Sequence, residues 1–525
     1  MRRITVLDTT LRDGAQTEGV SFSAEDKRRI ALELDRLGVD IVEGGNPAGN
    51  PKDRALFDDP PRLKRASFAA FGATRRADSD AASDAGLSAL LAAKTDTIVL
   101  FGKSSRFHVD EVLRVEPGRN LAMIEESIAR LAAAGRTVHF DAEHFFDGFG
   151  EDADYAIETA RAAARGGART VTLCDTNGGA LPWAAGMITG RMVRELGLPV
   201  GAHFHDDGGM AVASTLYAVE SGASFVHGTM GGVGERCGNA DLCAVLPALS
   251  LKMGLETGCA PRLARLTSAA RTIADIANLE IPRRAPYVGL SAFTHKGGMH
   301  VDGMRKNRRS FEHIDPALVG NERRLLISDQ AGRSALLDKL ADLAPDMTRD
   351  DPILAAIADQ LKQRERFGYV YEGAEGSFRL MALRMLGRAL PHFEALDFRV
   401  FASKPWADDS AQAYIKIRAN DQIEITAAEG DGPVNALDRA LRKALCVFYP
   451  QLSGVRLVDF KVRVIDGGGT GSTVRVTIES TDGKSVWGTV GVSRNIIEAC
   501  WTALTDAIEY KLSGLAEGSF SEVTT

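Results

Sequence analysis

The feature that most limits how this chain can fold is a regular alternation of short β-rich runs with longer helical runs over its first half. The candidate strands are Ile4–Asp8, Ile41–Gly44, Ser67–Phe71, Thr97–Phe101, Thr137–Glu143, Thr170–Cys174, Val200–His205 and Phe225–Thr229. The segments between them repeat apolar residues at helical spacing, and several end in a glycine suited to a helix C-cap. About eight strand–helix units in roughly 250 residues are typical of a (β/α)8 TIM barrel, whereas a doubly wound sheet rarely needs so many repeats. The predicted fold class is therefore α/β, with a barrel over residues 1–260.

The remaining chain needs its own cores, because 525 residues exceed what one hydrophobic core normally holds. Residues 261–395 are predicted to form a mostly helical linker region around one loop rich in glycine, histidine and basic residues, Tyr287–Arg309. Residues 396–515 repeat a strand–strand–strand–helix pattern twice, which predicts a pseudo-symmetric α+β domain. Residues 516–525 are predicted to form a C-terminal tail.

Composition excludes several classes of function. The formal net charge of -7 gives no electrostatic footprint for nucleic acid or for an anionic membrane surface. Six scattered cysteines without a Cys-x-x-Cys pair argue against a zinc ribbon or a disulfide framework. The N-terminus turns polar too early for a signal peptide, and no stretch approaches the roughly 20 apolar residues of a membrane span. We therefore expect a cytoplasmic protein that binds neither nucleic acid nor membrane.

Polar residues gather where the predicted strands end, and this is the face of a barrel that carries function. They are Arg12 and Asp13 after the first strand, Glu43 at the end of the second, Glu143 at the end of the fifth, Thr176 after the sixth, His203 and His205 in the seventh, and Asn239 after the eighth. Because parallel barrel strands all end at one mouth, these side chains should converge there.

The strongest local signal is the pair His203-x-His205. Alternate residues of a strand face the same side, so both imidazoles should point into the mouth. Together with a carboxylate such as Asp13 they would form a divalent metal site with open positions for substrate oxygens. Two hydrogen-bonded histidines without a metal are the alternative. The ligand types suit magnesium, manganese, zinc or cobalt alike.

Arg12, beside Asp13, can also serve chemistry. A fixed guanidinium stabilises negative charge that develops on a carbonyl oxygen. A structural ion pair with Glu43 is the alternative role, and such a pair would also orient the guanidinium. The glycine-rich run Gly231–Gly238 lacks the lysine of a P-loop, so we expect it to position Asn239 by close packing rather than to bind a nucleotide.

The middle region carries two histidines in the predicted loop, His295 and His300. The barrel site has no obvious general base of its own, and a separate region could supply one. The residues alone leave open which of the two histidines would act.

Taken together, these motifs resemble those of a known family. Asp8-Thr9-Thr10-Leu11-Arg12-Asp13-Gly14, His203-x-His205 and the run Gly234–Asn239 resemble the DRE-type TIM-barrel metalloenzymes, and within them the Claisen-condensing isopropylmalate, homocitrate and citramalate synthases. The run Glu43–Pro47 is most similar to the citramalate synthase branch. The run Asp431–Leu437 resembles the C-terminal allosteric and dimerisation domain of the family, so the resemblance extends over nearly the whole chain.

The resemblance implies a role for each matching residue. The implied metal ligands are Asp13, His203, His205 and Asn239, the implied catalytic residues are Arg12, Glu143 and His300, and the implied substrate-binding residues are Arg12, Glu43, Glu143, Thr176 and Asp302. In this scheme His300 is the base, and the resemblance implies that a dimer partner can donate it.

Three positions depart from the family pattern. Asp206 stands beside the histidine pair where the family usually has asparagine, which adds charge next to the expected metal. Asn46 replaces a tryptophan that is frequent in the branch, and Phe311 replaces a tyrosine. A different side chain therefore has to form that part of the pocket wall. Any role of the tyrosine hydroxyl is either absent or filled by another residue.

The resemblance also implies an activity, which is condensation of acetyl-CoA with pyruvate and water to give (R)-citramalate and CoA. This is the first step of a pyruvate route to isoleucine. It implies a homodimer with isoleucine as an effector of the C-terminal domain. The alternatives are a 2-isopropylmalate or homocitrate synthase, separated only by the keto-acid pocket, and a non-catalytic amino-acid-sensing homologue. CoA release with a panel of keto acids distinguishes them.

Overall fold

The computed structural model describes residues 2–296, 298–325, 336–337, 339–389, 391–403 and 410–515. The predicted tail, residues 516–525, lies outside the described residues. Contacts group the chain into two compact units. The first comprises Met1–Phe293 with His313–Arg323, and the second comprises Thr294–Glu312 with Arg324–Thr525. The expected linker region is therefore shared between the two units, since residues 261–293 and 313–323 group with the barrel and the remainder groups with the C-terminal domain.

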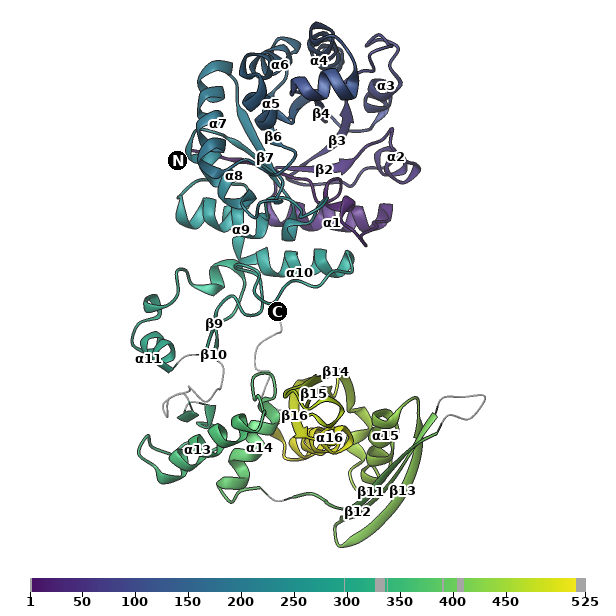
Figure 1. Cartoon of the computed structure of the whole chain (residues 1–525), viewed down its shortest axis with the longest axis vertical. Helices are drawn as coiled ribbons and strands as arrows, with labels where there is room; N and C mark the ends of the chain where they lie inside the picture. The colour runs from purple at the N-terminus through teal and green to yellow at the C-terminus, as the bar shows by residue number, and fades with distance from the viewer. Residues whose placement is uncertain are drawn as a thin grey trace. The chain divides into compact units, whose positions relative to one another are not determined.

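Eight parallel strands close into a barrel in the first unit, in the order β1 to β8, with β1 paired to β8 (Figure 1). Their bounds are β1 Thr5–Asp8, β2 Ile41–Gly45, β3 Ser67–Ala73, β4 Thr97–Lys103, β5 Thr137–Glu143, β6 Thr170–Asp175, β7 Val200–Phe204 and β8 Phe225–Gly228. The strands are almost wholly buried and rich in aliphatic residues, as expected for a sheet covered on both faces. The prediction of a TIM barrel is confirmed.

Helices surround these strands (Figure 1). They are α1 Ala24–Leu37, α2 Pro51–Asp58, α3 Ala85–Ala92, α4 Pro117–Ala133, α5 Phe145–Glu151, α6 Ala153–Gly166, α7 Pro182–Leu196, α8 Ala211–Glu220 and α9 Leu242–Pro247. Local sequence sets their ends. The side chains and backbone N–H groups of Ser23 and Asp26 form a capping box at the start of α1, and Gly38 ends α1 in the left-handed region at φ 98°.

One more helix, α10 (Leu266–Ile276), continues the first unit and packs against α1. The chain then leaves the unit and returns to it for a short segment. Asn321 ties that segment down, because its Nδ2 donates to the carbonyl oxygens of Tyr287 (2.8 Å) and Gly289 (3.0 Å). Thr267 adds a bond from its hydroxyl to the carbonyl oxygen of Val319 at 2.7 Å.

The second unit begins with short elements: β9 (Thr294–His295) pairs in parallel with β10 (Arg324–Leu325), and α11 spans Gly298–Lys306. The prediction of one continuous loop over Tyr287–Arg309 is therefore wrong. Gly297, Gly298 and Gly303 weaken the helical signal, and Met304 is the one side chain of this helix that the structure describes as buried. Helices α13 (Pro352–Arg366) and α14 (Glu375–Met385) follow.

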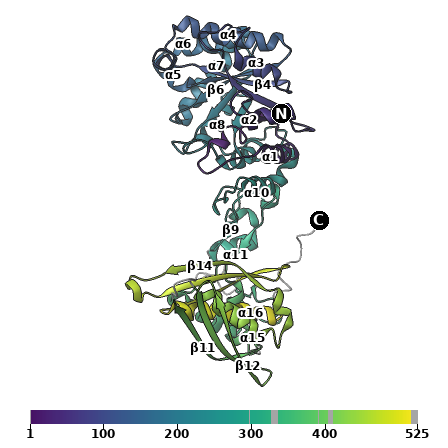
Figure 2. The same cartoon turned by 90° about the vertical axis from the view of Figure 1, so that its right-hand side faces the viewer.

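The C-terminal domain has the two expected strand–strand–strand–helix repeats (Figure 1 and Figure 2). The first consists of β11 Glu394–Ser403, β12 Ser410–Ala419, β13 Gln422–Gly430 and α15 Pro433–Leu445, and the second of β14 Arg456–Val464, β15 Val474–Thr481, β16 Val486–Ser493 and α16 Ile496–Leu512. Each sheet is antiparallel, and each has a register shift near the start of its first strand. One hydrophobic core joins both sheets and both helices.

Within the part of the chain that the structure describes, no helix has both the length and the apolar composition needed to cross a bilayer.

Candidate active site

The turn after β1 carries the first two site residues. The backbone N–H groups of Arg12, Asp13 and Gly14 all donate to the carbonyl oxygen of Thr9, at 3.1, 2.8 and 3.1 Å. Gly14 is required for close packing, because a Cβ there would lie 2.8 Å from a methyl group of Val233 in the loop after β8. The sequence motif thus builds a tight turn that holds Asp13 inside the mouth.

Asp13, His203 and His205 form one buried cluster. The Nε2 atoms of His203 and His205 lie 3.7 and 3.8 Å from Oδ2 of Asp13. One ligand atom from each of the three residues can be chosen so that all lie within 4.8 Å of one another. Among the described residues, the buried Nδ1 atoms of both histidines have no hydrogen-bond partner. Two imidazoles and a carboxylate with unsatisfied buried nitrogens fit a divalent cation.

The charge states of the cluster suit a cation. Burial and the neighbouring His205 lower the pKa of His203 to about 3, although Asp13 acts to raise it. Burial also lowers the pKa of His205. For Asp13, burial acts to raise the pKa, but Arg12 and the two histidines outweigh it and hold the value at about 2. At neutral pH the site therefore presents two neutral imidazoles and one carboxylate, the forms that bind metals.

Arg12 is held from three sides. Its Nε donates to Oε2 of Glu43 at 2.6 Å, and its Nη1 donates to Oδ2 of Asp13 at 3.0 Å. The guanidinium carbon lies 4.0 Å from the centre of the Phe71 ring, which stacks on Phe101 with ring centres 5.1 Å apart. The ion pair with Glu43 therefore exists, and it orients the guanidinium.

A cavity of about 210 Å³ joins most of the predicted barrel residues. Arg12, Asp13, Glu143, Thr176, His203 and His205 all line it. Glu43 lies behind Arg12 and is fully buried. Asn239 is joined to His205 by an isolated backbone bridge, and its Nδ2 donates to the carbonyl oxygen of Val233 at 3.2 Å. The structure thus brings six of the predicted residues to one cavity, with Glu43 bonded to Arg12 and Asn239 paired with the backbone of His205.

Glu143 and Thr176 each have a defined neighbour. Oε2 of Glu143 lies 2.6 Å from Nζ of Lys103, so the carboxylate charge is balanced inside the mouth. The hydroxyl oxygen of Thr176 accepts from the backbone N–H of His144 at 2.9 Å. Its own hydrogen can then point toward a ligand.

The two remaining predicted site residues, His300 and Asp302, lie on α11 in the second unit, and the structure describes each unit by itself. The His300 ring is exposed and stacks on Phe311, with ring centres 4.1 Å apart. His295, the alternative base, is buried, and its Nε2 lies 3.4 Å from Oε1 of Glu312. Of the two candidates, His300 has the accessible ring.

The residues that depart from the family pattern bond mainly to backbone. Oδ1 of Asp206 accepts from the N–H of Ala211 at the start of α8, at 2.8 Å. Oδ1 of Asn46 accepts from the N–H of Ala48 at 2.9 Å. Phe311 offers its ring as a stacking face to His300.

Several cavity residues received no role from the sequence, namely Phe71, Phe101, Cys174, Gln16 and Glu235. Phe71 and Phe101 belong to apolar strands, and in such a strand the sequence pattern predicts that any aromatic residue is part of the hydrophobic core. Their position near the C-terminal end of a barrel strand is the signal that could have found them. Asp141 also lines the cavity, and burial raises its pKa well above the usual range.

The fold and the cluster define a (β/α)8 barrel with a buried Asp/His/His site at its mouth. A family model described as HMGL-like matches residues 3–273, and the chain belongs to this family. Two further models match the rest: residues 287–366 match one described as homocitrate synthase post-HMGL domain-like, and residues 372–512 match the LeuA allosteric (dimerisation) domain.

The whole chain is similar to (R)-citramalate synthases. It is 46% identical over 517 residues to the one from Geobacter sulfurreducens, covering 98% of each chain. It is also 46% identical to that of Aquifex aeolicus, covering 97% of this chain and 98% of the relative, and to that of Synechocystis sp., covering 97% and 96%. The resemblance inferred from the motifs is confirmed.

Proposed function

We propose that this protein is an acyltransferase that condenses acetyl-CoA with pyruvate and water to give (R)-citramalate and CoA. The observation that carries the proposal is the buried cluster of Asp13, His203 and His205 beside an anchored Arg12, in a chain similar over nearly its full length to (R)-citramalate synthases. Carboxylate and imidazole ligands next to a fixed cation suit a reaction that builds negative charge on a keto oxygen.

Asp13, His203 and His205 would hold a divalent metal ion, with Asn239 beside them. When bound, the ion supplies a Lewis acid and a template for the keto acid. Magnesium, manganese, zinc and cobalt all suit these ligands.

Arg12 would stabilise the charge that grows on the keto oxygen as the new carbon–carbon bond forms. Glu43 and Phe71 fix its guanidinium before substrate arrives, so little reorganisation is needed during the reaction. The hydroxyl of Thr176 would donate to the keto acid, and Glu143, with its charge balanced by Lys103, would accept a hydrogen bond in the same mouth.

His300 would take a proton from the methyl group of acetyl-CoA, with Asp302 binding substrate on the same helix. The resulting carbanion attacks the keto carbon of pyruvate, the alkoxide gains a proton, and water then cleaves the thioester to release CoA. The exposed ring of His300 favours it over the buried His295 as the base.

The aromatic wall of the cavity favours pyruvate among keto acids. The stacked rings of Phe71 and Phe101 line the cavity beside Arg12. A methyl group fits against such a wall more easily than an isopropyl group does. This argues for pyruvate over 2-ketoisovalerate as the acceptor.

The test is CoA release by the purified full-length protein from acetyl-CoA and a panel of keto acids, with and without a chelator. We expect pyruvate to give the highest kcat/KM, the chelator to abolish turnover, and chiral chromatography to find the (R) product. Absence of CoA release with every keto acid contradicts the activity, and is the result expected of a non-catalytic sensor. Preference for 2-ketoisovalerate contradicts only the choice of pyruvate.

We also propose that the protein is a homodimer. Phe460, Val462 and Val464 of β14 pair across the sheet with Ile478, Val476 and Val474, so they continue the apolar face that holds the core. Yet they are 36%, 42% and 58% exposed.

The two repeats of the C-terminal domain differ in how the first strand of each sheet is covered. Phe398 follows the register shift of β11 as Phe460 follows that of β14. Phe398 is covered by Trp501 of α16, with ring centres 4.6 Å apart. Helix α15, the counterpart of α16, contains no aromatic residue. A second copy of this domain, which matches a dimerisation domain, would cover β14.

We place the enzyme in the cytoplasm, because all six cysteines are free thiols. We further propose isoleucine as an effector that binds the C-terminal domain, since this domain matches an allosteric one. Titration of isoleucine into the CoA-release assay tests this, with valine and leucine as controls. Activity that ignores all three amino acids would refute it.

A further inference from the structure

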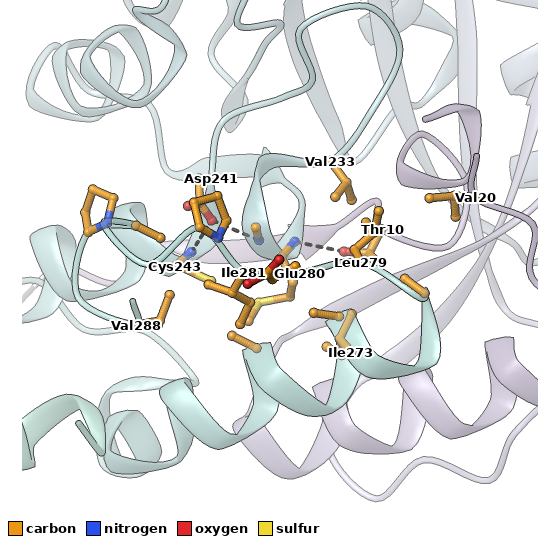
Figure 3. Close-up of a pocket in the computed structure, with 18 of the residues that line it drawn as sticks. Thr10, Val20, Val233, Asp241, Cys243, Ile273, Leu279, Glu280, Ile281 and Val288 are labelled. Carbon is orange, nitrogen blue, oxygen red and sulfur yellow. Dashed lines mark hydrogen bonds between the residues drawn. The ribbon is translucent and has the colours of Figure 1, made fainter. Parts of the chain in front are cut away.

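A second cavity, of about 440 Å³, lies in the first unit and shares no described lining residue with the candidate active site. Its walls come from the β1–α1 loop, the β8–α9 loop, and α10 with the stretch that follows it (Figure 3). Most of the lining side chains are aliphatic, among them Val20, Val233, Ile273, Ile281 and Val288. An apolar cavity of this size is enough for a small organic ligand.

The same two loops also carry residues of the metal-type site, which comprises the Asp13/His203/His205 cluster and Asn239, whose backbone pairs with that of His205. Thr10 lines the cavity, and its Oγ1 accepts from the N–H of Met230 in the other loop at 2.9 Å. Asp13, three residues after Thr10, lines the active site. In the second loop Val233 lines the cavity, and its carbonyl oxygen holds Nδ2 of Asn239 at 3.2 Å. Each loop thus contributes to the cavity and to the metal-type site.

Carboxylates are the prominent polar groups of the cavity. Oδ1 of Asp241 accepts from the N–H groups of Gly231 (3.0 Å) and Cys243 (2.8 Å), which fixes the carboxylate in the wall and also caps α9. Glu280 is exposed and supplies a second carboxylate, and Arg284 a single cation. Aliphatic walls with two carboxylates complement an aliphatic chain that ends in an ammonium group.

We propose that this cavity binds a small aliphatic ammonium compound, either a simple amine or an aliphatic amino acid whose carboxylate meets Arg284. The chain of the ligand lies against α10, and its ammonium group lies between Asp241 and Glu280. A bound ligand restrains Val233 and thereby Asn239, so it changes the affinity of the neighbouring site for a divalent metal. By linkage, the metal changes the affinity for the ligand by the same factor.

The experiment is isothermal titration of the full-length protein with n-hexylamine, norleucine and hexanoic acid as probes, which needs no turnover. Ala274 lines the cavity from α10, so Ala274→Phe should fill it and abolish binding. Thr272, exposed on the same helix, gives the matched control Thr272→Phe, which should bind as the wild type does. Glu280→Gln keeps the exposed surface folded and should weaken amine binding by up to about fivefold, the worth of one exposed ion pair.

Three results would overturn the proposal: no binding of either ammonium probe to the wild type, equal binding of hexanoic acid, or hexylamine binding that survives both Ala274→Phe and Glu280→Gln. Binding of hexylamine alone identifies a simple amine as the ligand class, and tighter binding of norleucine identifies an amino acid. A Mn²⁺ titration with and without the bound probe measures the coupling. Equal Mn²⁺ affinity in the two titrations contradicts the link to the metal-type site. The CoA-release assay remains independent, so failure here leaves the condensation reaction untouched.

Discussion

Nε of Arg12 lies 2.6 Å from Oε2 of Glu43, and Glu43 is fully buried while Arg12 lines the cavity. Burial raises the pKa of the Glu43 carboxyl, and the Arg12 guanidinium opposes that rise. The pair therefore has one member inside the protein and one at the place where substrate binds. A buried partner fixes the direction of a guanidinium more firmly than a solvated one, because it cannot exchange with water.

Replacing Glu43 tests this anchoring. We expect Glu43→Gln to lower kcat by about 10- to 100-fold, because Arg12 loses the charge that orients it toward the developing negative charge. KM for pyruvate should change less, and metal content should stay at the wild-type level. Steady-state kinetics with metal analysis check this. A rise in KM of the same size with an unchanged kcat would mean that Arg12 only binds substrate.

Removing one imidazole tests the metal site. We expect His203→Ala to reduce the bound divalent metal from about one ion per chain to nearly none, while the circular dichroism spectrum stays that of the wild type. His108→Ala is the control, because His108 is a half-buried histidine that stacks on His144, outside the Asp/His/His cluster. Mass-spectrometric metal analysis of both proteins decides the matter, and full metal content in His203→Ala would refute the assignment.

Enlarging the cavity tests the choice of keto acid. Phe101→Ala removes a ring from the wall without touching the contact between Arg12 and Phe71. We expect the ratio of kcat/KM for 2-ketoisovalerate to that for pyruvate to rise about tenfold or more. An unchanged ratio would show that this wall does not select the acceptor.

A charge on β14 tests the dimer. Phe460→Glu places a carboxylate on the apolar face that we expect a second copy to cover, and a buried unpaired charge opposes association. The mass measured by light scattering should fall from that of a dimer to that of a monomer of 56.2 kDa. Exposed Val447→Glu is the control, because Val447 is 63% exposed and lies outside β14. A dimer that survives Phe460→Glu at low concentration would exclude this face.

The C-terminal domain should lose stability in acid through Asp482. Burial acts to raise the pKa of Asp482, but the hydrogen bonds from Lys511 Nζ (2.8 Å) and from the backbone of Ser485 and Lys484 outweigh it and lower the pKa. A carboxyl whose pKa falls on folding adds stability above its unfolded value, near 3.8, and loses it as the pH falls below that value. Asp482→Asn should therefore be less stable than the wild type at pH 7, with the difference shrinking below pH about 4. Thermal unfolding across this range measures it. A constant difference would contradict the assignment.

The sequence by itself determined the barrel and most of its site. Eight apolar runs at regular spacing were enough to place the strands, because a buried parallel strand imposes a local composition. His203 and His205 were placed together by the two-residue period of a strand alone. The same reasoning failed over Tyr287–Arg309, where Gly298 and Gly303 weaken the helical pattern of α11.

Only the tertiary structure decided which distant residues share a cavity. Phe71 and Phe101 come from different strands, and nothing local distinguishes an aromatic residue that faces the mouth from one that faces the core. The contact of Gly14 with Val233 depends on barrel closure between β1 and β8, which joins loops more than 200 residues apart in the sequence. The pattern of a sequence records how deeply each residue is buried, whereas the shape of a site depends on which buried surfaces meet.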